Sequence, residues 1–479
     1  MNIASASGRR AAPSADELPG PTGLLGWRGN LLRFFADPTG FMQSLRTRYG
    51  EVAGLARGHR DYVFAFGARH NRMVLGNTAL FHNLDASNIP VRVPPRSALA
   101  RLFSGLIQMN GDRHTQQRRL MTPAFNRRAL ESYLDDVTSV IRDHVDAWRV
   151  GDCRDAAQEM SDLTLSIAMK VLLGLDPDQA GERVRALFRE WTRLVFSLTT
   201  LSLPYDVPGL PYRRLLAISE LLVAELHGII RRKRMQDCCD SSILTAMLSA
   251  NDADQTVLTD DEVVGQTNFL CIAGHATTTN ALIWTLFLLD RHPDIWDAVH
   301  AECAQLDVTR PMIERLQNMT MLEAAITESL RLMPPVLWWC RISTTAFQLD
   351  RYHFAAGTKV IQSAYITHRD PDVYREPKRF IPQRWLGRTA EPYEYCPFSA
   401  GPRMCLGASL AVMEIKIALS LIIQRFRTAV PTGSRVDIRG PMILAPKSKV
   451  PIALLRVGSH HEQGEVRGNI KAVLDLPLP

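Results

Sequence analysis

A cysteine at position 405 is the eighth residue of a glycine-containing string, 398–407 (FSAGPRMCLG), and a long apolar stretch follows the string. A cysteine placed just before a helix start meets unpaired backbone N–H groups and the positive end of the helix dipole. Both favour the thiolate over the thiol. Such a thiolate can act as a strong axial donor to iron. Gly401 permits a tight turn, and Gly407 lets a flat ligand approach the backbone closely.

Two other side chains of this string fit an iron-ligand loop. Arg403 can pair with a carboxylate, and Phe398 can shield the sulfur from water. The alternative is a buried structural cysteine beside an ordinary loop, which is the commoner state of an isolated cysteine.

An acidic and a basic residue, Glu328 and Arg331, stand three positions apart in a segment with helical periodicity. Residues i and i+3 share one face of a helix and can form a fixed ion pair. A family resemblance described below adds Arg384, further along the chain, as a third member of this cluster. Alone, the pair would be an ordinary surface contact.

The segment 260–291 has the composition of a long buried helix, yet it carries Gly274 near its middle. A glycine there costs roughly 1 kcal/mol relative to alanine, so a packing or functional gain is expected. Thr277 can donate to the carbonyl of Ala273 four residues earlier and so loosen the helix. The alternative is a threonine kink within a core helix.

His114 and Arg118 are four residues apart and therefore lie on one helical face, where they can reach one anionic group. A pair of this kind usually lies on a solvated face. Arg341, which follows Pro335 by six residues, is a further cation in a β-prone stretch.

The elements that must position these residues are mostly helices. A periodicity of 3.6 residues predicts helices at 131–149, 156–174, 180–200, 212–235, 260–291, 321–333 and 407–427, and a short one that ends near Tyr49. Strand-like patterns occur at 52–66, 341–361 and 441–456. We therefore expect a fold that is mainly α with a small β part. Residues 1–17 are expected to be disordered, 18–456 to form a single domain, and 457–479 to be a C-terminal tail.

Composition excludes several classes of protein. The net charge of +7 is modest for 479 residues, and no basic run interleaved with aromatic residues indicates nucleic-acid binding. No stretch of about 18 uncharged apolar residues predicts a membrane anchor, and the N-terminus lacks the apolar region of a secretory signal. The eight cysteines have no metal-finger spacing. These features favour a cytoplasmic protein with reduced thiols.

Taken together, these motifs resemble the cytochromes P-450, of the soluble bacterial type, over nearly the whole chain. The resemblance implies the P-450 fold, with a long central helix over the haem and a C-terminal helix after the ligand loop. It implies haem b with Cys405 as the iron ligand and a structural role for the Glu328 cluster. The other implied cofactor contacts are Phe398, Gly401, Arg403, Gly407, His114, Arg118, Arg341, Ala273 and Gly274, and the implied catalytic hydroxyls are Thr277 and Thr278.

The chain departs from the family pattern at Ala276, where an acid usually precedes the threonine. The usual acid–alcohol pair for proton delivery is therefore incomplete. His275 is adjacent, but neighbouring residues do not face the same way on a helix. A water chain anchored on Thr277 and Thr278, or a hydroxyl of the substrate, are the other sources of protons.

The implied activity is a monooxygenase that inserts one oxygen atom from O₂ into an apolar small molecule. Electrons would come from a separate ferredoxin or flavodoxin with its reductase, and the chain is expected to be a monomer. An aromatic wall at Trp338 and Trp339 points to an apolar or ring-bearing substrate. The missing acid keeps a peroxide-driven hydroxylase or a rearrangement catalyst open, and a non-catalytic haem-thiolate sensor is a third alternative. A basic docking face, or merely a solvated one, is expected at Arg119, Arg127, Arg128 and Lys416.

Overall fold

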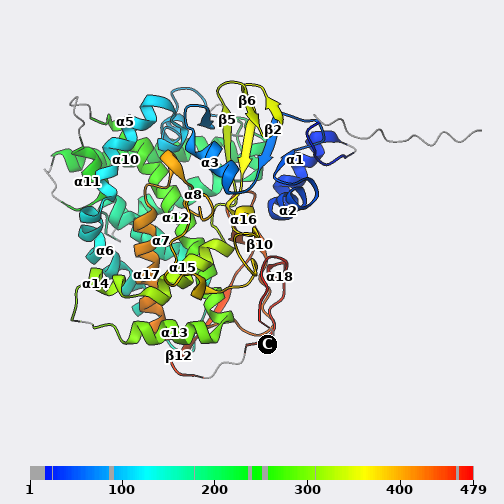
Figure 1. Cartoon of the computed structure of the whole chain (residues 1–479). Helices are drawn as coiled ribbons and strands as arrows, with labels where there is room; N and C mark the ends of the chain where they lie inside the picture. The colour runs from blue at the N-terminus through cyan, green and yellow to red at the C-terminus, as the bar shows by residue number, and fades with distance from the viewer. Residues whose placement is uncertain are drawn as a thin grey trace, which may run out of the picture.

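The computed structural model describes residues 17–23, 25–85, 91–176, 179–235, 240–250, 257–307, 309–459 and 463–477. Of the N-terminal segment predicted to be disordered, all but Glu17 lies outside these residues. The predicted class is confirmed, because the described residues form mainly helices with small sheets at the periphery (Figure 1).

The helices fill most of the molecule, and Figure 1 shows most of them to the left of and below the largest sheet, with α1 and α2 to its right. They are α1 (Gly26–Ala36), α2 (Pro38–Tyr49), α3 (Ala68–Gly76), α4 (Ala98–Leu102), α5 (Gly111–Met121), α6 (Arg127–Asp146), α7 (Ala156–Ile167), α8 (Gln179–Val195), α9 (Leu198–Ser202), α10 (Pro211–Met235), α11 (Ile243–Leu248), α12 (Asp260–Arg291), α13 (Pro293–Ala304), α14 (Met312–Gln317), α15 (Thr320–Leu332), α16 (Ala364–Thr367), α17 (Ala408–Arg425) and α18 (Ile470–Val473).

The largest sheet has the strand order β1-β2-β8-β5-β3, in which only β2 and β8 run parallel. It lies beside α1 and α2 (Figure 1). A smaller sheet has the order β4-β12-β9, and two hairpins join β6 to β7 and β10 to β11. The strands are β1 (Val52–Gly54), β2 (Tyr62–Ala65), β3 (Phe81–Asn83), β4 (Cys153–Asp155), β5 (Trp339–Ser343), β6 (Phe347–Leu349), β7 (Tyr352–Phe354), β8 (Lys359–Gln362), β9 (Phe426–Ala429), β10 (Ile438–Arg439), β11 (Ala445–Pro446) and β12 (Pro451–Arg456).

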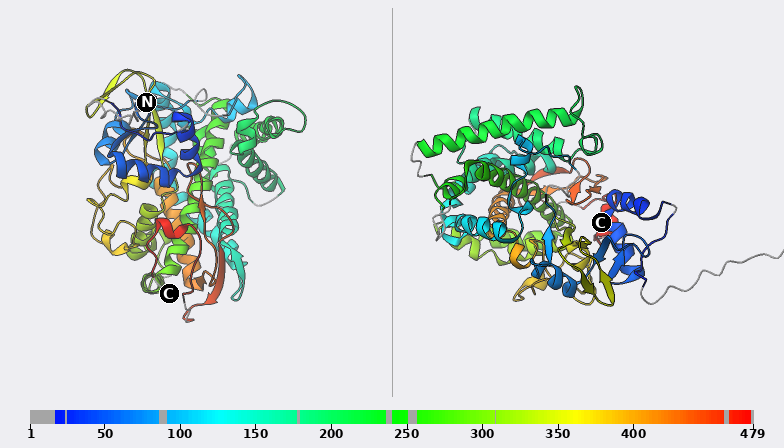
Figure 2. Two further views of the ribbon diagram at one scale, coloured as in Figure 1. Left: turned by 90° about the vertical axis from the view of Figure 1, so that its right-hand side faces the viewer. Right: turned by 90° about the horizontal axis from the view of Figure 1, so that it is seen from above.

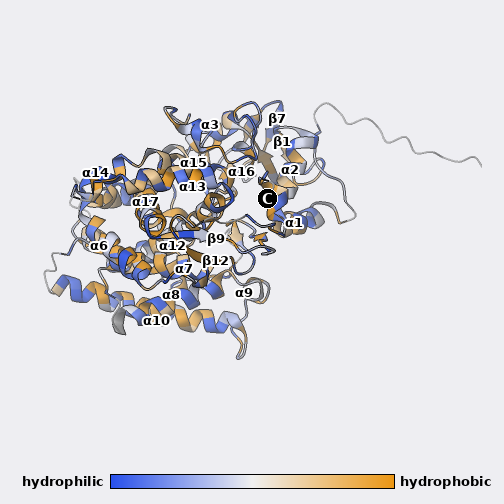
Figure 3. Cartoon of the chain, turned by 90° about the horizontal axis from the view of Figure 1, so that it is seen from below, coloured by the Kyte–Doolittle hydropathy of each residue, from blue (hydrophilic) through white to orange (hydrophobic). Residues whose placement is uncertain are grey.

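Helix α12 runs through the centre of the molecule and packs against α7, α4, α15 and α17. A capping box starts it, because Thr259 accepts from the Glu262 backbone and the Glu262 side chain accepts from Thr259. Within the described residues, α12 has the length and apolar composition of a membrane span, but 67% of its apolar window is buried, as in a core helix. Figure 3 shows apolar colour gathered on α12 and α17, whereas α10 at the edge alternates between the two colours.

Several predicted helix boundaries agree with the structure, but the helix predicted at 131–149 spans Arg127–Asp146 and three others also differ. The α12 prediction matches its observed bounds. Helix α7 ends earlier than predicted and continues as a π-helical turn, Ala168–Leu172. The predicted helix 180–200 is two helices, α8 and α9, and the last residues of the predicted helix 407–427 belong to strand β9.

The C-terminal segment packs on the body of the protein. Ile470 in α18 is completely buried, and Leu474 is nearly so. The carbonyl of Val473 accepts a hydrogen bond from Arg369, and the carbonyl of Gly464 accepts one from Arg291 at the end of α12. The left view of Figure 2 shows the red turn of α18 over the helical part of the molecule. The segment predicted as a tail is thus a packed strap over the residues that the structure describes, 463–477.

Candidate active site

The loop before α17 is closed by two backbone hydrogen bonds. The Cys405 N–H donates to the carbonyl of Phe398 (2.9 Å), and the Met404 N–H donates to the carbonyl of Gly401 (3.0 Å). Gly401 has φ +70°, and a Cβ on it would lie 2.6 Å from the carbonyl oxygen of Leu75 in α3. Any other residue at 401 would therefore push the loop away from α3.

Cys405 is exposed, and it lies three residues before Ala408, the first residue of α17. Desolvation raises the pKa of the thiol, whereas a hydrogen bond from the Gly407 N–H and the charge of Arg118 lower it. Although the residue as a whole is exposed, desolvation by the surrounding protein atoms is the largest of these effects, so the protein alone favours the thiol. A bound metal cation reverses that balance, because a metal-ligating cysteine gives up its proton.

Helix α5 connects the cysteine loop to α12 through side-chain hydrogen bonds. Arg118 donates to the carbonyl of Met404 (2.8 Å), and Gln266 of α12 donates to Gln117 (3.1 Å). Helix α17, which begins next to Cys405, also packs against α12. The cysteine loop, α5 and α12 are therefore three connected walls of one site.

The middle of α12 is accessible although the helix is buried on either side of it. Gly274 is exposed, and Ala273 and Thr277 are half-buried. A Cβ built on Gly274 would meet nothing within 4 Å. The Thr277 hydroxyl donates to the carbonyl of Ala273 (2.6 Å), as its spacing predicts. Thr278 is only 2% exposed, so the structure does not bring it to the accessible face.

Three guanidinium groups and one imidazole gather beside the cysteine loop, and among the described residues they share no carboxylate. His114 and Arg341 are buried, and Arg118 and Arg403 are half-buried. Burial, followed by the charges of Arg403, Arg118 and Arg341, lowers the pKa of His114 to about 4. Burial and the nearby Arg403 lower the pKa of Arg341 to about 10. Such mutual repulsion is costly unless an anion occupies the centre of the cluster.

Arg403 shows most directly that this cluster lacks a partner. One of its terminal nitrogens donates to the Asn110 side chain (2.8 Å). Its Nε and Nη1 atoms are buried and have no hydrogen-bond partner among the described residues. Within that part of the chain, none of the four side chains forms an ion pair with Asp or Glu. The cluster is built to receive an anionic group.

Comparison with known proteins decides the identity of this site. The profile of the family described as Cytochrome P450 matches residues 18–453. The chain belongs to the cytochrome P450 family.

The alignments with similar P450 proteins span most of this chain. A Synechocystis cytochrome P450 120 is 26% identical over 446 residues, which are 92% of this chain and 97% of that protein. A Streptomyces melanosporofaciens cyclooctat-9-en-7-ol 5-monooxygenase is 28% identical over 417 residues, 85% of this chain and 88% of its own. A solved structure described as retinoic acid bound cyanobacterial CYP120A1 superposes with a TM-score of 0.80 and 25% identity, and covers 92% of this chain and 99% of that one.

As a P450, the protein is a haem-thiolate monooxygenase that binds iron protoporphyrin IX and uses a redox partner and a small substrate. The residues present fit this group. The orphaned guanidinium atoms of Arg403 and the uncompensated Arg341 suit the haem propionates, and the open space beside Gly274 suits a flat ring system. The exposed Cys405 is of the residue type that a haem-thiolate protein needs as its sulfur ligand.

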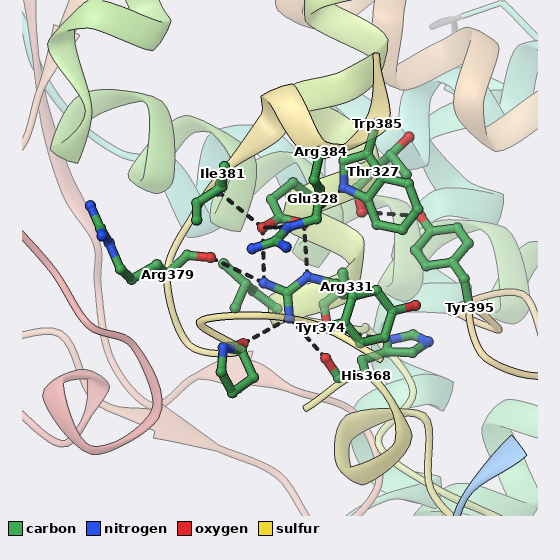
Figure 4. Close-up of polar contacts among 12 residues, drawn as sticks. Thr327, Glu328, Arg331, His368, Tyr374, Arg379, Ile381, Arg384, Trp385 and Tyr395 are labelled. Atoms are coloured by element: carbon green, nitrogen blue, oxygen red, sulfur yellow. Dashed lines mark hydrogen bonds and ion pairs between the residues drawn. The ribbon is translucent and has the colours of Figure 1, made fainter. Parts of the chain in front are cut away.

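The predicted Glu328 cluster is a complete network (Figure 4). Glu328 and Arg331 are fully buried and pair through two short bonds of 2.7 and 2.8 Å. The remaining N–H groups of Arg331 donate to three carbonyls, and Glu328 also accepts from Arg384, Trp385 and the Ile381 N–H. Every donor of Arg331 is therefore used.

Sequence reasoning missed His368, which links this cluster to the cysteine loop. Its Nδ1 lies 3.1 Å from the carbonyl of Arg331, and its Nε2 accepts from the Cys396 N–H (2.9 Å). The carbonyl can only accept and the amide can only donate, so the ring is neutral with its hydrogen on Nδ1. Burial is the main cause that lowers the pKa of His368 to about 3. The signal in the sequence was a histidine among helix-ending residues, which is too common to single out.

The structure gives packing partners for both tryptophans of the predicted aromatic wall. Trp338 packs against Phe34 and Phe35 of α1, and its Nε1 donates to the carbonyl of Pro441 (2.6 Å), so it is a packing residue. Trp339 packs beside Leu75, Cys396 and Ala400 near the ligand loop. Tryptophan at these positions therefore says little about the substrate.

Lys416 does not belong to a basic docking face. It is 5% exposed, and its ammonium group donates to Glu323 (2.8 Å) and to the carbonyl of Leu316. Arg119, Arg127 and Arg128 are exposed, as predicted. A lysine on a helix that is buried on most sides must find an acceptor inside, and Glu323 provides one from α15.

Proposed function

We propose that the protein hydroxylates or epoxidises an apolar small molecule with one oxygen atom of O₂, using electrons from a separate ferredoxin or flavodoxin and its reductase. The observation that carries the proposal is the exposed Cys405 sulfur beside a cation cluster without a carboxylate. When bound, haem supplies the reductive activation of O₂. We further propose that the protein acts in the cytoplasm as a monomer.

The residues of the chain have separate roles in this proposal. Cys405 is the iron ligand, Phe398 shields its sulfur, and Gly401 and Gly407 shape the loop around it. Arg403, Arg341, Arg118 and His114 hold the propionates. Ala273 and Gly274 leave room beside α12, and the Thr277 hydroxyl holds a water on that side, with Thr278 as its buried neighbour.

The substrate in this proposal is apolar and ring-bearing. The accessible part of α12 is bounded by Phe269, Leu270 and Ile272, which carry no charge. The names of two relatives include retinoic acid and cyclooctat-9-en-7-ol, both largely hydrocarbon molecules with a ring. Their chemistry supports the same class here.

Two parallel assays test this function. The purified holoprotein is incubated with a ring-bearing apolar substrate, either with NADPH and surrogate redox partners or with hydrogen peroxide alone. We expect oxygenated product in the first assay and little in the second. Rapid turnover with peroxide alone would favour the peroxide-driven alternative, and a product without added oxygen would favour a rearrangement. Binding without turnover in either assay would favour a sensor.

Thr277→Ala sharpens the test of the oxygen side. We expect substrate binding to remain nearly intact while product formed per NADPH falls and hydrogen peroxide rises, because the hydroxyl that holds a water is lost. Ala276→Asp, which restores the family pattern, is expected to preserve or raise the yield per NADPH. Full coupling in Thr277→Ala would assign proton delivery to the substrate or to another water chain.

A further inference from the structure

The side of α12 that faces away from its accessible part is bonded to α7. At 100° per residue, Ala273, Gly274 and Thr277 share one face of the helix, and His275 and Thr279 lie on the opposite face. The His275 ring nitrogen Nδ1 lies 2.9 Å from the Thr164 hydroxyl of α7. That hydroxyl lies 2.7 Å from the Thr279 hydroxyl, which donates back to the carbonyl of His275 (2.8 Å).

The hydrogens available to this cluster fix its direction. Each threonine hydroxyl has one hydrogen, and a carbonyl can only accept. If Nδ1 carries a hydrogen, then His275 donates to Thr164, Thr164 to Thr279 and Thr279 to the His275 carbonyl, and all three contacts are satisfied. If Nδ1 lacks a hydrogen, only two can be. In the Nδ1–H form the single Thr164 hydrogen is shared between the Thr279 hydroxyl and the carbonyl of Met160 (2.9 Å).

The same stretch of α12 is weak without an external brace. Gly274 lowers helix propensity, and side chains of Thr277, Thr279 and Asn280 each bond a carbonyl four residues earlier. Such bonds compete with the backbone ladder of the helix. The contact of His275 and Thr279 with Thr164 spans two helices, so it can hold the weak turn in place.

His275 is poorly suited to carry protons to the other face. Its Nε2 points to Ser161 (3.5 Å), and the charged groups near the ring are Asp162 of α7 and Arg189 of α8. Burial, with Arg189 adding to it, lowers the pKa of His275 to about 4, so the ring stays neutral near pH 7.

We infer that His275 is a positioning residue, which with Thr164 and Thr279 locks α12 to α7 and thereby holds Gly274 and Thr277 toward the cysteine loop. The inference rests on the proposed function in one respect: it takes the Gly274 and Thr277 face of α12 as the side on which O₂ reacts. The lock itself is a property of the two helices.

Hydrogen–deuterium exchange of the holoenzyme measures the lock without reference to turnover. His275→Leu and Thr164→Val each remove one hydrogen-bonding group at similar volume. We expect either change to speed exchange of amides 273–281 by about tenfold, the equivalent of one hydrogen bond, and the double variant to add little more. His275→Asn keeps an N–H donor near the Nδ1 position and Thr164→Ser keeps the hydroxyl, so both should restore slow exchange.

A matched control variant changes another threonine of the same helix. The Thr285 hydroxyl meets Ser329 of α15 at 2.9 Å, so Thr285→Val should change exchange near residue 285 and leave 273–281 unaffected. Product formed per NADPH should fall in His275→Leu and recover in His275→Asn. In the wild type, the pH profile of this yield should show no step assignable to His275 between pH 5.5 and 8.5, because this range lies about one unit or more above the folded pKa of His275. Unchanged exchange at 273–281 in His275→Leu would overturn the inference. Low coupling in His275→Asn despite restored exchange would also overturn it, in favour of proton transfer. Absence of turnover in every variant would count against the proposed function and leave the exchange test intact.

Discussion

Two clusters of charged side chains lie near the cysteine loop: the Glu328 cluster, and the Arg403 cluster of Arg403, Arg341, Arg118 and His114. They differ in whether the protein itself supplies a partner for every buried polar atom. In the Glu328 cluster every N–H of Arg331 has an acceptor, and the carboxylate receives five hydrogen bonds. In the Arg403 cluster, two buried nitrogens of one guanidinium have no partner among the described residues. A complete network serves the fold, whereas an incomplete one awaits a ligand of opposite charge.

This difference gives the two clusters opposite responses to the loss of a charge. Removing one member of a complete buried network leaves another charge uncompensated. Removing one cation from a repulsive cluster relieves the apoprotein, and the loss appears only when the anionic ligand binds.

The largest expected effect is in the complete cluster. Glu328→Gln keeps the shape of the side chain but leaves Arg331 buried without its counterion, and we expect a loss of about 3–5 kcal/mol in the free energy of unfolding. Denaturant titration of the apoprotein measures it. Arg127→Ala, which removes an exposed pair with Glu131, is the control and should change little. A stable Glu328→Gln apoprotein would remove the distinction between the clusters.

A smaller effect of a different kind is expected for Arg403→Leu. The apoprotein should be as stable as the wild type or more so, because a repelled cation is gone. Haem affinity should fall about 10- to 100-fold, the value of one hydrogen bond to a charged group. Haem titration followed by absorbance, beside denaturation of the apoprotein, separates the two quantities. Loss of apoprotein stability with unchanged haem affinity would assign Arg403 to the structural class.

The smallest effect concerns pH and the link between the Glu328 cluster and the loop. Unfolded His368 takes up a proton below about pH 6.5, whereas the folded ring, with its pKa lowered to about 3, does not. The unfolded state therefore binds more protons, and stability that is complete above pH 6.5 falls as pH drops, by up to about 1.4 kcal/mol per unit. The unfolding free energy of wild type between pH 6.5 and 5 should decline more steeply than that of His368→Asn. Equal slopes would mean that His368 is free to protonate in the folded state.

Local strings in the sequence predicted much of this arrangement. The cysteine loop, the Glu328–Arg331 spacing and the bond from Thr277 to Ala273 depend on residues within ten positions of each other. Gly401 predicted a tight turn, and the structure shows in addition that α3 leaves no room for a side chain at this position. The mainly helical fold follows from the same local periodicity.

Contacts between distant segments could not be predicted in this way. Lys416 can be buried because Glu323 lies beside it on another helix. Trp338 packs against Phe34 of α1. His275 gave no sign in the sequence that it faces α7. The apolar residues of the C-terminal segment, such as Ile470, predict burial only once a surface that receives them is known.

The ferrous carbon monoxide spectrum tests the central claim, that Cys405 is the sulfur ligand of the iron, most directly. Wild type should show the red-shifted absorbance band that thiolate ligation produces. Cys405→Ser should lose that band, whereas Cys396→Ser, at a buried cysteine nine residues earlier, should keep it. Persistence of the band in Cys405→Ser would contradict the account.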